Sequence, residues 1–314
     1  MTAALEPVHE LLQAREVPLG GIRSILVRRT LPNRALRTVG AWCFVDHYGP
    51  HDVSAGRGMD VPPHPHTGLQ TVSWLLAGEV EHRDSMGSLA TIRPGELNLM
   101  TSGRGIAHSE VSTGDGPTLH GAQLWVALPD AYRHQAPHFE HHTDLPEVDD
   151  WPRGGFHATV IVGSLGGQTS PARTYTPLVG AHVRLSDGAS GVLPLEPEFE
   201  HGSLLLRGDA TVDGVPVEVG SLLYLGGGRT ELAFATTRDA ELLLLGGTPF
   251  EEELLMWWNF VGRSHEEIVA DRADWEAGQR FGVVHGYPGD VLPAPALPTT
   301  RLRARPRRTE RLNL

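Results

Sequence analysis

Short apolar runs separated by turns rich in glycine and proline recur along the first half of the chain. The clearest runs are Leu69–Leu76, Leu89–Arg93, Leu97–Met100 and Thr118–Leu128. The first is followed by Ala77-Gly78-Glu79, the second by Pro94-Gly95-Glu96 and the last by Pro129. Apolar segments of this length between such residues are typical of β-strands joined by tight turns. The pattern therefore predicts a β-rich first half.

The same rhythm of turns and strands returns in Phe156–Gly247 and indicates an internal duplication. The intervening stretch Pro137–Gly155 is rich in histidine, aspartate and proline and has no sustained period, as is typical of a linker. We therefore expect an N-terminal domain at 1–137, a linker at 138–155, a second domain at 156–290, and a proline- and arginine-rich tail at 291–314.

Helical signals occur near the end of the chain. Ser264 followed by Glu267 three positions later has the pattern of a capping box, and the segment Ser264–Glu276 carries an apolar face. We expect this segment and Glu251–Val261 to form the few short peripheral helices of the protein.

Composition agrees with this pattern. The 37 glycines and 24 prolines among 314 residues are spread along the chain, which favours many short strands in a sandwich or barrel. The predicted fold class is therefore all-β. Two domains of this size can each bury a core without disulfides. The single cysteine, Cys43, excludes an intramolecular disulfide and any zinc or iron–sulfur site built from cysteines.

The charge of the chain limits the classes of partner that it is expected to bind. The formal net charge is −12 and all 26 basic residues are arginine. The last fourteen residues, RLRARPRRTERLNL, carry +5, which leaves −17 on the rest. A body this acidic repels phosphate backbones and argues against nucleic-acid binding, and the tail is expected to be a solvated, disordered end. With no signal-peptide pattern and no long apolar span, we expect a soluble cytoplasmic protein without a membrane partner.

Two pairs of possible metal ligands stand out. His64 and His66 lie in VPPHPHTGLQT, and His108 and Glu110 lie in GRGIAHSEV. Side chains at i and i+2 of a strand point to the same face, so each pair would face one way. Two such strands facing each other inside a barrel would bring three imidazoles and one carboxylate together.

This donor set suits borderline and hard transition metals. Without a thiolate, imidazole and carboxylate favour iron(II) above all, although nickel, manganese, copper and zinc accept the same donors. Four protein ligands on a six-coordinate ion would leave two positions for other ligands. We therefore expect Fe(II), or another divalent transition metal, at His64, His66, His108 and Glu110.

The stretches HPHTGLQTVSWLLAGEVEHRDSMGS and IRPGELNLMTSGRGIAHSE resemble the pirin family of the cupin superfamily. The segments RSILVRRTLPN, WCFVDHYGP, QLWVALP and LLLLGGTPFEEELLMWWNFVGRSHEEI extend the resemblance over about residues 20 to 275. It implies two tandem cupin barrels packed face to face, with iron only in the N-terminal barrel, on the four residues named above.

Two positions depart from the family pattern. Gln70 stands where relatives usually have a glutamate, and Thr67 stands where they have an arginine, so the surroundings of the site could differ. The second half has no H-x-H pair, and its best-placed histidine is His201. We expect that barrel to be free of metal and to have a structural role.

The resemblance also implies an activity, since bacterial relatives have been assigned quercetinase activity, the O₂-dependent cleavage of a flavonol. Glu110 would be either a fixed ligand or a labile carboxylate that takes the substrate proton. His82, Arg83 and Gln123 are candidates for substrate binding, although the first two could form an ion-paired turn with Asp84 and Gln123 could face solvent. The alternative is regulation through a protein partner, as the iron-dependent animal pirins imply.

Overall fold

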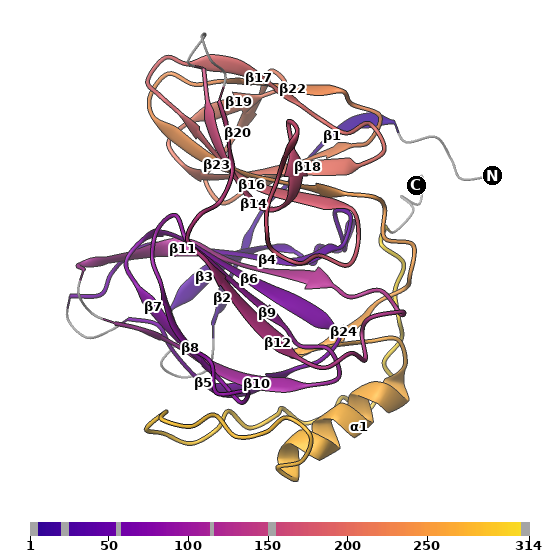
Figure 1. The fold of residues 1–314 in the computed structure, drawn as a ribbon. Helices are drawn as coiled ribbons and strands as arrows, with labels where there is room; N and C mark the ends of the chain where they lie inside the picture. The colour runs from indigo at the N-terminus through magenta and orange to yellow at the C-terminus, as the bar shows by residue number, and fades with distance from the viewer. Residues whose placement is uncertain (1–5, 20–24, 55–57, 114–115, 150–154, 309–314) are drawn as a thin grey trace. The chain divides into compact units, whose positions relative to one another are not determined.

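Strands account for almost all regular structure in the computed structural model, which describes residues 6–19, 25–54, 58–113, 116–149 and 155–308 (Figure 1). Among these residues there are 25 strands and one helix. The prediction of an all-β fold is therefore confirmed. The described part of the chain contains no helix long and apolar enough to cross a membrane.

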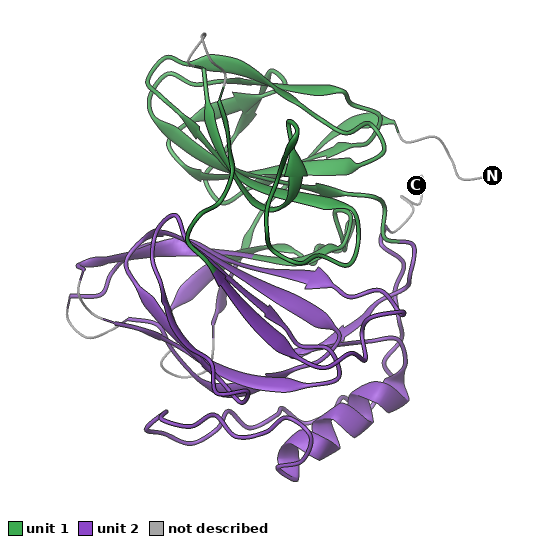
Figure 2. Cartoon of the chain, viewed as in Figure 1, with its two compact units in different colours: residues 1–15, 28–45, 142–250 green, residues 16–27, 46–141, 251–314 purple. Residues whose placement is uncertain are grey.

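The chain folds into two compact units (Figure 2). Unit 1 comprises residues 1–15, 28–45 and 142–250, and unit 2 comprises residues 16–27, 46–141 and 251–314. Each unit thus combines stretches that lie far apart in the sequence. Residues 251–290, predicted as part of the second domain, and residues 291–314, predicted as a tail, belong to unit 2.

Unit 1 contains an eight-stranded sheet and a four-stranded sheet. The order in the larger sheet is β1 (Pro7–Leu12), β21 (Leu222–Gly226), β18 (Glu200–Arg207), β23 (Ala240–Gly247), β16 (Leu178–Leu185), β14 (His157–Leu165) and β13 (Glu147–Asp149), with β15 (Gln168–Thr169) paired to β14. The order in the smaller sheet is β17 (Ser190–Pro194), β22 (Glu231–Ala235), β19 (Ala210–Val212) and β20 (Val215–Val217). Two sheets of this kind can enclose one core.

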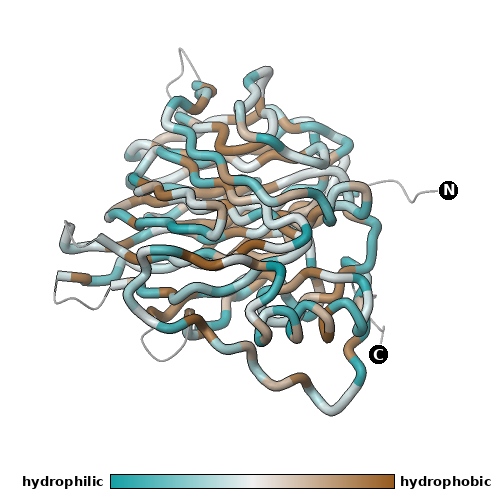
Figure 3. Tube along the Cα trace, turned by 60° about the horizontal axis from the view of Figure 1, so that its bottom comes forward, coloured by the Kyte–Doolittle hydropathy of each residue, from teal (hydrophilic) through white to brown (hydrophobic). Residues whose placement is uncertain are grey.

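Alternation along the strands builds the core of unit 1. Val179, Ala181, Val183 and Leu185 of β16 all belong to it, as every second residue of a strand faces the same side. Along the trace as a whole, hydrophobic and hydrophilic residues succeed one another over short distances (Figure 3). The early segment 28–45 joins this unit through Trp42, whose Nε1 donates to the carbonyl of Val179 at 3.0 Å.

The remaining strands form a seven-stranded, a four-stranded and a two-stranded sheet. The order in the first is β12 (His138–His142), β9 (Leu97–Thr101), β6 (Leu69–Ala77), β11 (Thr118–Ala127), β4 (Trp42–Asp52), β3 (Leu26–Leu31) and β2 (Arg15–Pro18). The order in the second is β5 (Asp60–His66), β10 (Ile106–Ser112), β7 (Val80–Asp84) and β8 (Leu89–Ile92), and the third is the hairpin β24 (Leu255–Trp257) and β25 (Phe260–Gly262).

The strands predicted from apolar runs are confirmed. β6, β8, β9 and β11 begin at the predicted residues and end within one residue of the predicted ends. The stretch 138–155, expected as a linker, contains β12 and β13.

The C-terminal segment confirms one predicted helix and corrects the other. Helix α1 (His265–Glu276) begins after Ser264, whose side chain accepts a hydrogen bond from the Glu267 amide. The predicted helix at Glu251–Val261 is wrong, because this stretch forms the hairpin β24–β25. Trp258 has a φ of 52° in its turn, and the chain beyond pairs with Thr67, so the tertiary contact outweighs local helix propensity.

The expectation of a disordered basic tail is wrong for residues 301–308. Arg301 makes two hydrogen bonds to Glu266, and the backbone of Arg305 pairs with that of Leu254. Residues 309–314, the rest of the predicted tail, lie outside the described residues.

Candidate metal centre

Two neighbouring strands of unit 2 bring three of the four predicted metal ligands together. β5 carries His64 and His66, β10 carries His108, and the antiparallel register places His108 opposite His64. The pair spacing keeps both β5 histidines on one face, as predicted. The ring centroids of His64 and His108 are 4.3 Å apart, and the ring centroid of His66 lies 5.0 Å from each of them.

These three residues, the metal-site histidines, form a group suited to a metal ion. Their ligand nitrogens all lie within 4.8 Å of one another. All three are buried, with exposed fractions of 6%, 2% and 0% for His64, His66 and His108. A cation drawn to this point would be held inside the protein and away from bulk water.

One ring nitrogen of each metal-site histidine has a protein neighbour. Nδ1 of His64 donates to the Pro62 carbonyl at 2.8 Å, and Nδ1 of His66 donates to the Asn259 carbonyl at 3.2 Å. Nδ1 of His108 lies 3.3 Å from Nδ1 of His82. Such contacts fix the ring orientation and leave Nε2 for a metal.

The Nε2 atom of His108 tests whether the residues fit a metal. This atom is buried and has no hydrogen-bond partner among the described residues. Buried polar atoms are nearly always paired, so an orphaned imidazole nitrogen in a group of three is the feature expected of a metal ligand. The residues present therefore fit a metal ion.

The protonation state of the metal-site histidines also fits. Burial lowers the pKa of His64 to about 4, and it lowers the pKa of His66 and of His108 well below the usual value. Each neighbouring imidazole lowers these pKa values further, because two positive charges so close together would repel. The three rings are thus neutral at pH 7, the form that binds metals.

Glu110 lies on β10 beside these histidines, two residues after His108. Its Oε1 accepts hydrogen bonds from Ser73 Oγ at 3.3 Å and from Gln123 Nε2 at 3.2 Å. Burial raises the pKa of the carboxyl, although His82, Ser73 and Gln123 act in the opposite direction. In the described part of the chain, the group of ligand atoms within 4.8 Å comprises the three histidines and does not include Glu110.

The three predicted substrate-binding residues lie in different surroundings. His82 is buried beside His108, stacks on Phe139 with ring centroids 4.3 Å apart, and places Nε2 3.2 Å from Asp84 Oδ2. Gln123 is also buried and contacts Glu110. Arg83 is on the opposite face of β7, where it bonds to Glu81 at 2.7 Å.

Several further residues around the site were not predicted from the sequence. Tyr48 is buried, and burial, with a smaller contribution from Glu110, raises the pKa of its phenol. Ser73 donates to Glu110 and, at 2.8 Å, to Gln123 Oε1. Ser73 lies within the predicted strand Leu69–Leu76, so strand alternation could have suggested it. No sequence signal links the Asn259 carbonyl to His66.

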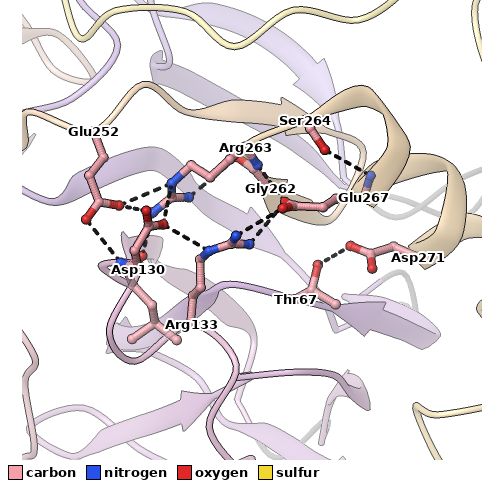
Figure 4. Close-up of polar contacts among 10 residues, drawn as sticks. Thr67, Asp130, Arg133, Glu252, Gly262, Arg263, Ser264, Glu267 and Asp271 are labelled. Atoms are coloured by element: carbon pink, nitrogen blue, oxygen red, sulfur yellow. Dashed lines mark hydrogen bonds and ion pairs between the residues drawn. The ribbon is translucent and has the colours of Figure 1, made fainter.

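The two residues that depart from the family pattern, Gln70 and Thr67, each donate a hydrogen bond to another side chain. Gln70 donates from Nε2 to Thr101 Oγ1 at 2.9 Å. Thr67 donates to Asp271 of α1 at 2.7 Å (Figure 4). The Asp271 carboxylate also accepts a hydrogen bond from Arg280 at 2.5 Å. Thr67, which follows His66 in the sequence, therefore links the end of β5 to α1.

A second set of ion pairs links the start of α1 and the residues just before it to the turn after β11. Arg133 makes two hydrogen bonds of 3.0 Å to Glu267, and Arg263 binds Glu252 and lies 3.1 Å from Asp130 (Figure 4). Burial and then Arg133 act in opposite directions on Glu267, and the net effect lowers the pKa of its carboxyl. The helix is thereby anchored by charge at its first turn.

Comparison with known families decides the identity of the fold. The pirin family model matches residues 24–126, and the model of the pirin C-terminal cupin domain matches residues 180–282. Together these ranges cover more than half of the chain. The protein belongs to the pirin family. The prediction of two tandem cupin domains is therefore confirmed.

Relatives of this pirin include proteins named for an enzyme. A Pseudomonas aeruginosa protein named "Putative quercetin 2,3-dioxygenase" is 46% identical over 294 residues, covering 93% of this chain and 92% of the relative. A pirin-like protein of Caulobacter vibrioides is 37% identical over 290 residues, covering 91% and 98%. A crystal structure of quercetin 2,3-dioxygenase from Acinetobacter baumannii has a TM-score of 0.89 at 41% identity and covers 94% of this chain and 97% of its own.

Proposed function

We propose that this pirin is a metal-dependent quercetin 2,3-dioxygenase, which cleaves flavonols with O₂. The observation that carries the proposal is the buried group of metal-site histidines, whose ligand nitrogens lie within 4.8 Å of one another. The names of two similar proteins, at 46% and 41% identity, support the substrate class. Both observations are expected if the site uses a metal on a small molecule.

Iron(II) is the metal we propose for this site. His64, His66 and His108 would hold it through Nε2, and neutral imidazoles beside a carboxylate suit iron(II) when no thiolate is near. Nickel, manganese, copper and zinc share this preference for nitrogen and oxygen donors, so metal analysis is part of the test. A metal held here would supply Lewis acidity and a path for electrons between a flavonol and O₂.

Glu110 is the residue we propose for proton transfer. Both of its hydrogen bonds, from Ser73 and Gln123, end on Oε1. This arrangement would leave Oε2 either to hold the metal or to accept the proton of a flavonol hydroxyl. A carboxyl whose pKa is raised by burial is a better proton acceptor than an exposed one.

His82 and Gln123 are the positioning residues of this proposal. His82 lies 3.3 Å from Nδ1 of His108 and would fix the orientation of that ring, while Asp84 holds His82 in turn. Gln123 holds the carboxylate of Glu110. Arg83 faces away from the metal-site histidines and has no role in the proposal.

The test is O₂ uptake by iron-loaded protein in the presence of quercetin. We expect uptake equal to the quercetin consumed, and its loss in His108→Ala. His157→Ala changes an ion-paired histidine in unit 1 and should leave the rate unchanged. Uptake no greater than that of His108→Ala would overturn the proposal and would favour regulation through a protein partner. Glu110→Gln should retain most of the metal and lose most of the rate.

A further inference from the structure

The barrel of unit 1 has a buried histidine that the proposed function does not use. His201 lies on β18 and is 0% exposed. His201, Ser203 and Leu205 alternate along this strand, and Leu205 belongs to the core of unit 1. Because residues two apart face the same side, the ring of His201 points toward the interior of the barrel, near its end.

Neither ring nitrogen of His201 has a hydrogen-bond partner in the part of the chain that the structure describes. The hydroxyl of Ser203, on the same face, is also buried without a partner there. Buried polar side chains are almost always paired, so two orphaned groups on one strand face call for an explanation. A bound molecule would supply the hydrogen-bond partners that these two side chains lack.

A cavity of about 370 Å³ opens beside His201. Its wall includes Leu165, Val179, Leu195 and Phe199, with Glu196 among its exposed residues. The ring centroids of Phe199 and His201 are 6.1 Å apart. The wall thus combines apolar side chains, Phe199 among them, with the polar side chains of Glu196 and His201. A concave site that joins apolar surface to a few polar groups is suited to a small organic molecule.

The ring of His201 packs closely against the neighbouring strand β23. A Cβ atom at position 246 would lie 2.6 Å from Cδ2 of His201, so Gly246 on the neighbouring strand is needed for the ring to fit. The ring is therefore held against β23, and the cavity borders it elsewhere.

Charge in this region favours a neutral ligand. Burial and, to a smaller extent, Arg229 lower the pKa of His201 to about 4, so the ring is neutral at pH 7. Arg229 lies 2.5 Å from Asp213, which neutralises it, and Glu196 adds a negative charge at the cavity. A neutral imidazole offers one donor and one acceptor, which a hydroxyl group can match with one acceptor and one donor.

We propose that the cavity beside His201 binds a neutral hydroxylated aromatic molecule of one or two rings, with its hydroxyl on His201 and its rings against Phe199. An apolar cavity of about 150 Å³ is enough for benzene, so this volume accommodates one or two rings. The site is separate from the metal-site histidines, which belong to unit 2.

The test uses the full-length protein with 2-naphthol as the probe. In protein labelled with ¹⁵N at histidine, naphthol should shift the two ring nitrogen signals of His201 saturably. Calorimetry should show binding at least tenfold weaker in His201→Phe, whose ring is of similar size. His108→Ala should change the affinity less than twofold, because it alters only the other unit. The anion 2-naphthoate should bind at least tenfold more weakly than 2-naphthol.

Each of the other outcomes would overturn the proposal. These outcomes are His201 signals that do not move up to the solubility limit of naphthol, a non-saturating drift of all histidine signals, and a loss of binding in His108→Ala. Equal or tighter binding of naphthoate would overturn the ligand class. If His201→Phe does not fold, the wild-type signals, assigned with His201→Gln, still decide the matter. The test is independent of quercetin turnover.

Discussion

At the scale of single residues, the candidate metal centre depends on which ring nitrogen each histidine has available. The backbone carbonyls of Pro62 and Asn259 accept hydrogen bonds from Nδ1 of His64 and His66, respectively, and these carbonyls cannot ionise. The tautomer that the carbonyls favour in each ring therefore does not change with pH. Burial keeps the same rings neutral, so both effects prepare Nε2 to bind a cation.

Removing one metal-site histidine should cost metal affinity. We expect His64→Ala and His66→Ala each to weaken metal binding at least tenfold, since each removes one nitrogen donor and leaves the others in place. Elemental analysis of protein purified without added metal, followed by titration of the apoprotein, measures this. The matched control is His182→Gln, a buried histidine of unit 1 that pairs with Glu241 at 3.0 Å. Equal losses in the control would contradict the site.

His201 should make the protein less stable in mild acid. Its pKa is about 4 in the folded state because of burial and Arg229, against about 6.5 in an unfolded chain. Below pH 6.5 the unfolded state binds a proton that the folded state does not, so the free energy of unfolding falls as the pH falls toward 4. The full difference corresponds to about 3 kcal/mol.

The measurement is the free energy of unfolding of wild type and His201→Phe between pH 7.5 and about 4.5. The wild type should lose more stability over this interval than the variant, which has no group to titrate at this position. Parallel curves would show that the ring does not stay neutral in the folded protein.

At the scale of elements, strand periodicity predicted much of the candidate centre. The two-residue spacing placed His64 with His66, and the antiparallel pairing of β5 and β10 brings His108 to them. The register shift between His108 and Glu110 had no signal in the sequence. Nor did the turn that carries Asn259 to His66, since Glu251–Val261 has the composition of a helix but forms a hairpin that pairs with Thr67 and Arg305.

Helix α1 should lose stability when its cap is removed. Ser264 accepts a hydrogen bond from the Glu267 amide at 3.3 Å, so Ser264→Ala leaves that donor without its partner. We expect a loss of about 1 kcal/mol in the free energy of unfolding, measured by chemical denaturation. Ser190→Ala, at an exposed position of β17, is the matched control and should change stability by less than about 0.5 kcal/mol. A loss no larger than that of the control would contradict the capping role.

At the scale of the whole molecule, the sequence predicted two β-rich parts but not how the chain divides between them. Turn and strand signals are local, so they describe consecutive stretches. Trp42 joins unit 1 through a hydrogen bond to Val179, 137 positions along the chain, and Leu292 donates to the carbonyl of Pro63 in unit 2. Contacts at such separations depend on which faces are buried, and one sequence carries no direct signal for them.

The division of the chain into two units predicts which backbone amides a bound metal should protect from hydrogen exchange. A ligand that binds only the folded state stabilises it by about 3 kcal/mol at a free concentration 100 times its dissociation constant. We therefore expect added iron(II), under anaerobic conditions, to slow amide hydrogen exchange in β5 and β10, measured by mass spectrometry. Exchange in β17 and β22 of unit 1 should not change, because no metal-site histidine belongs to that unit. His108→Ala should abolish the protection in unit 2. Equal protection of both units would contradict a site confined to unit 2, and protection that survives in His108→Ala would place the metal elsewhere.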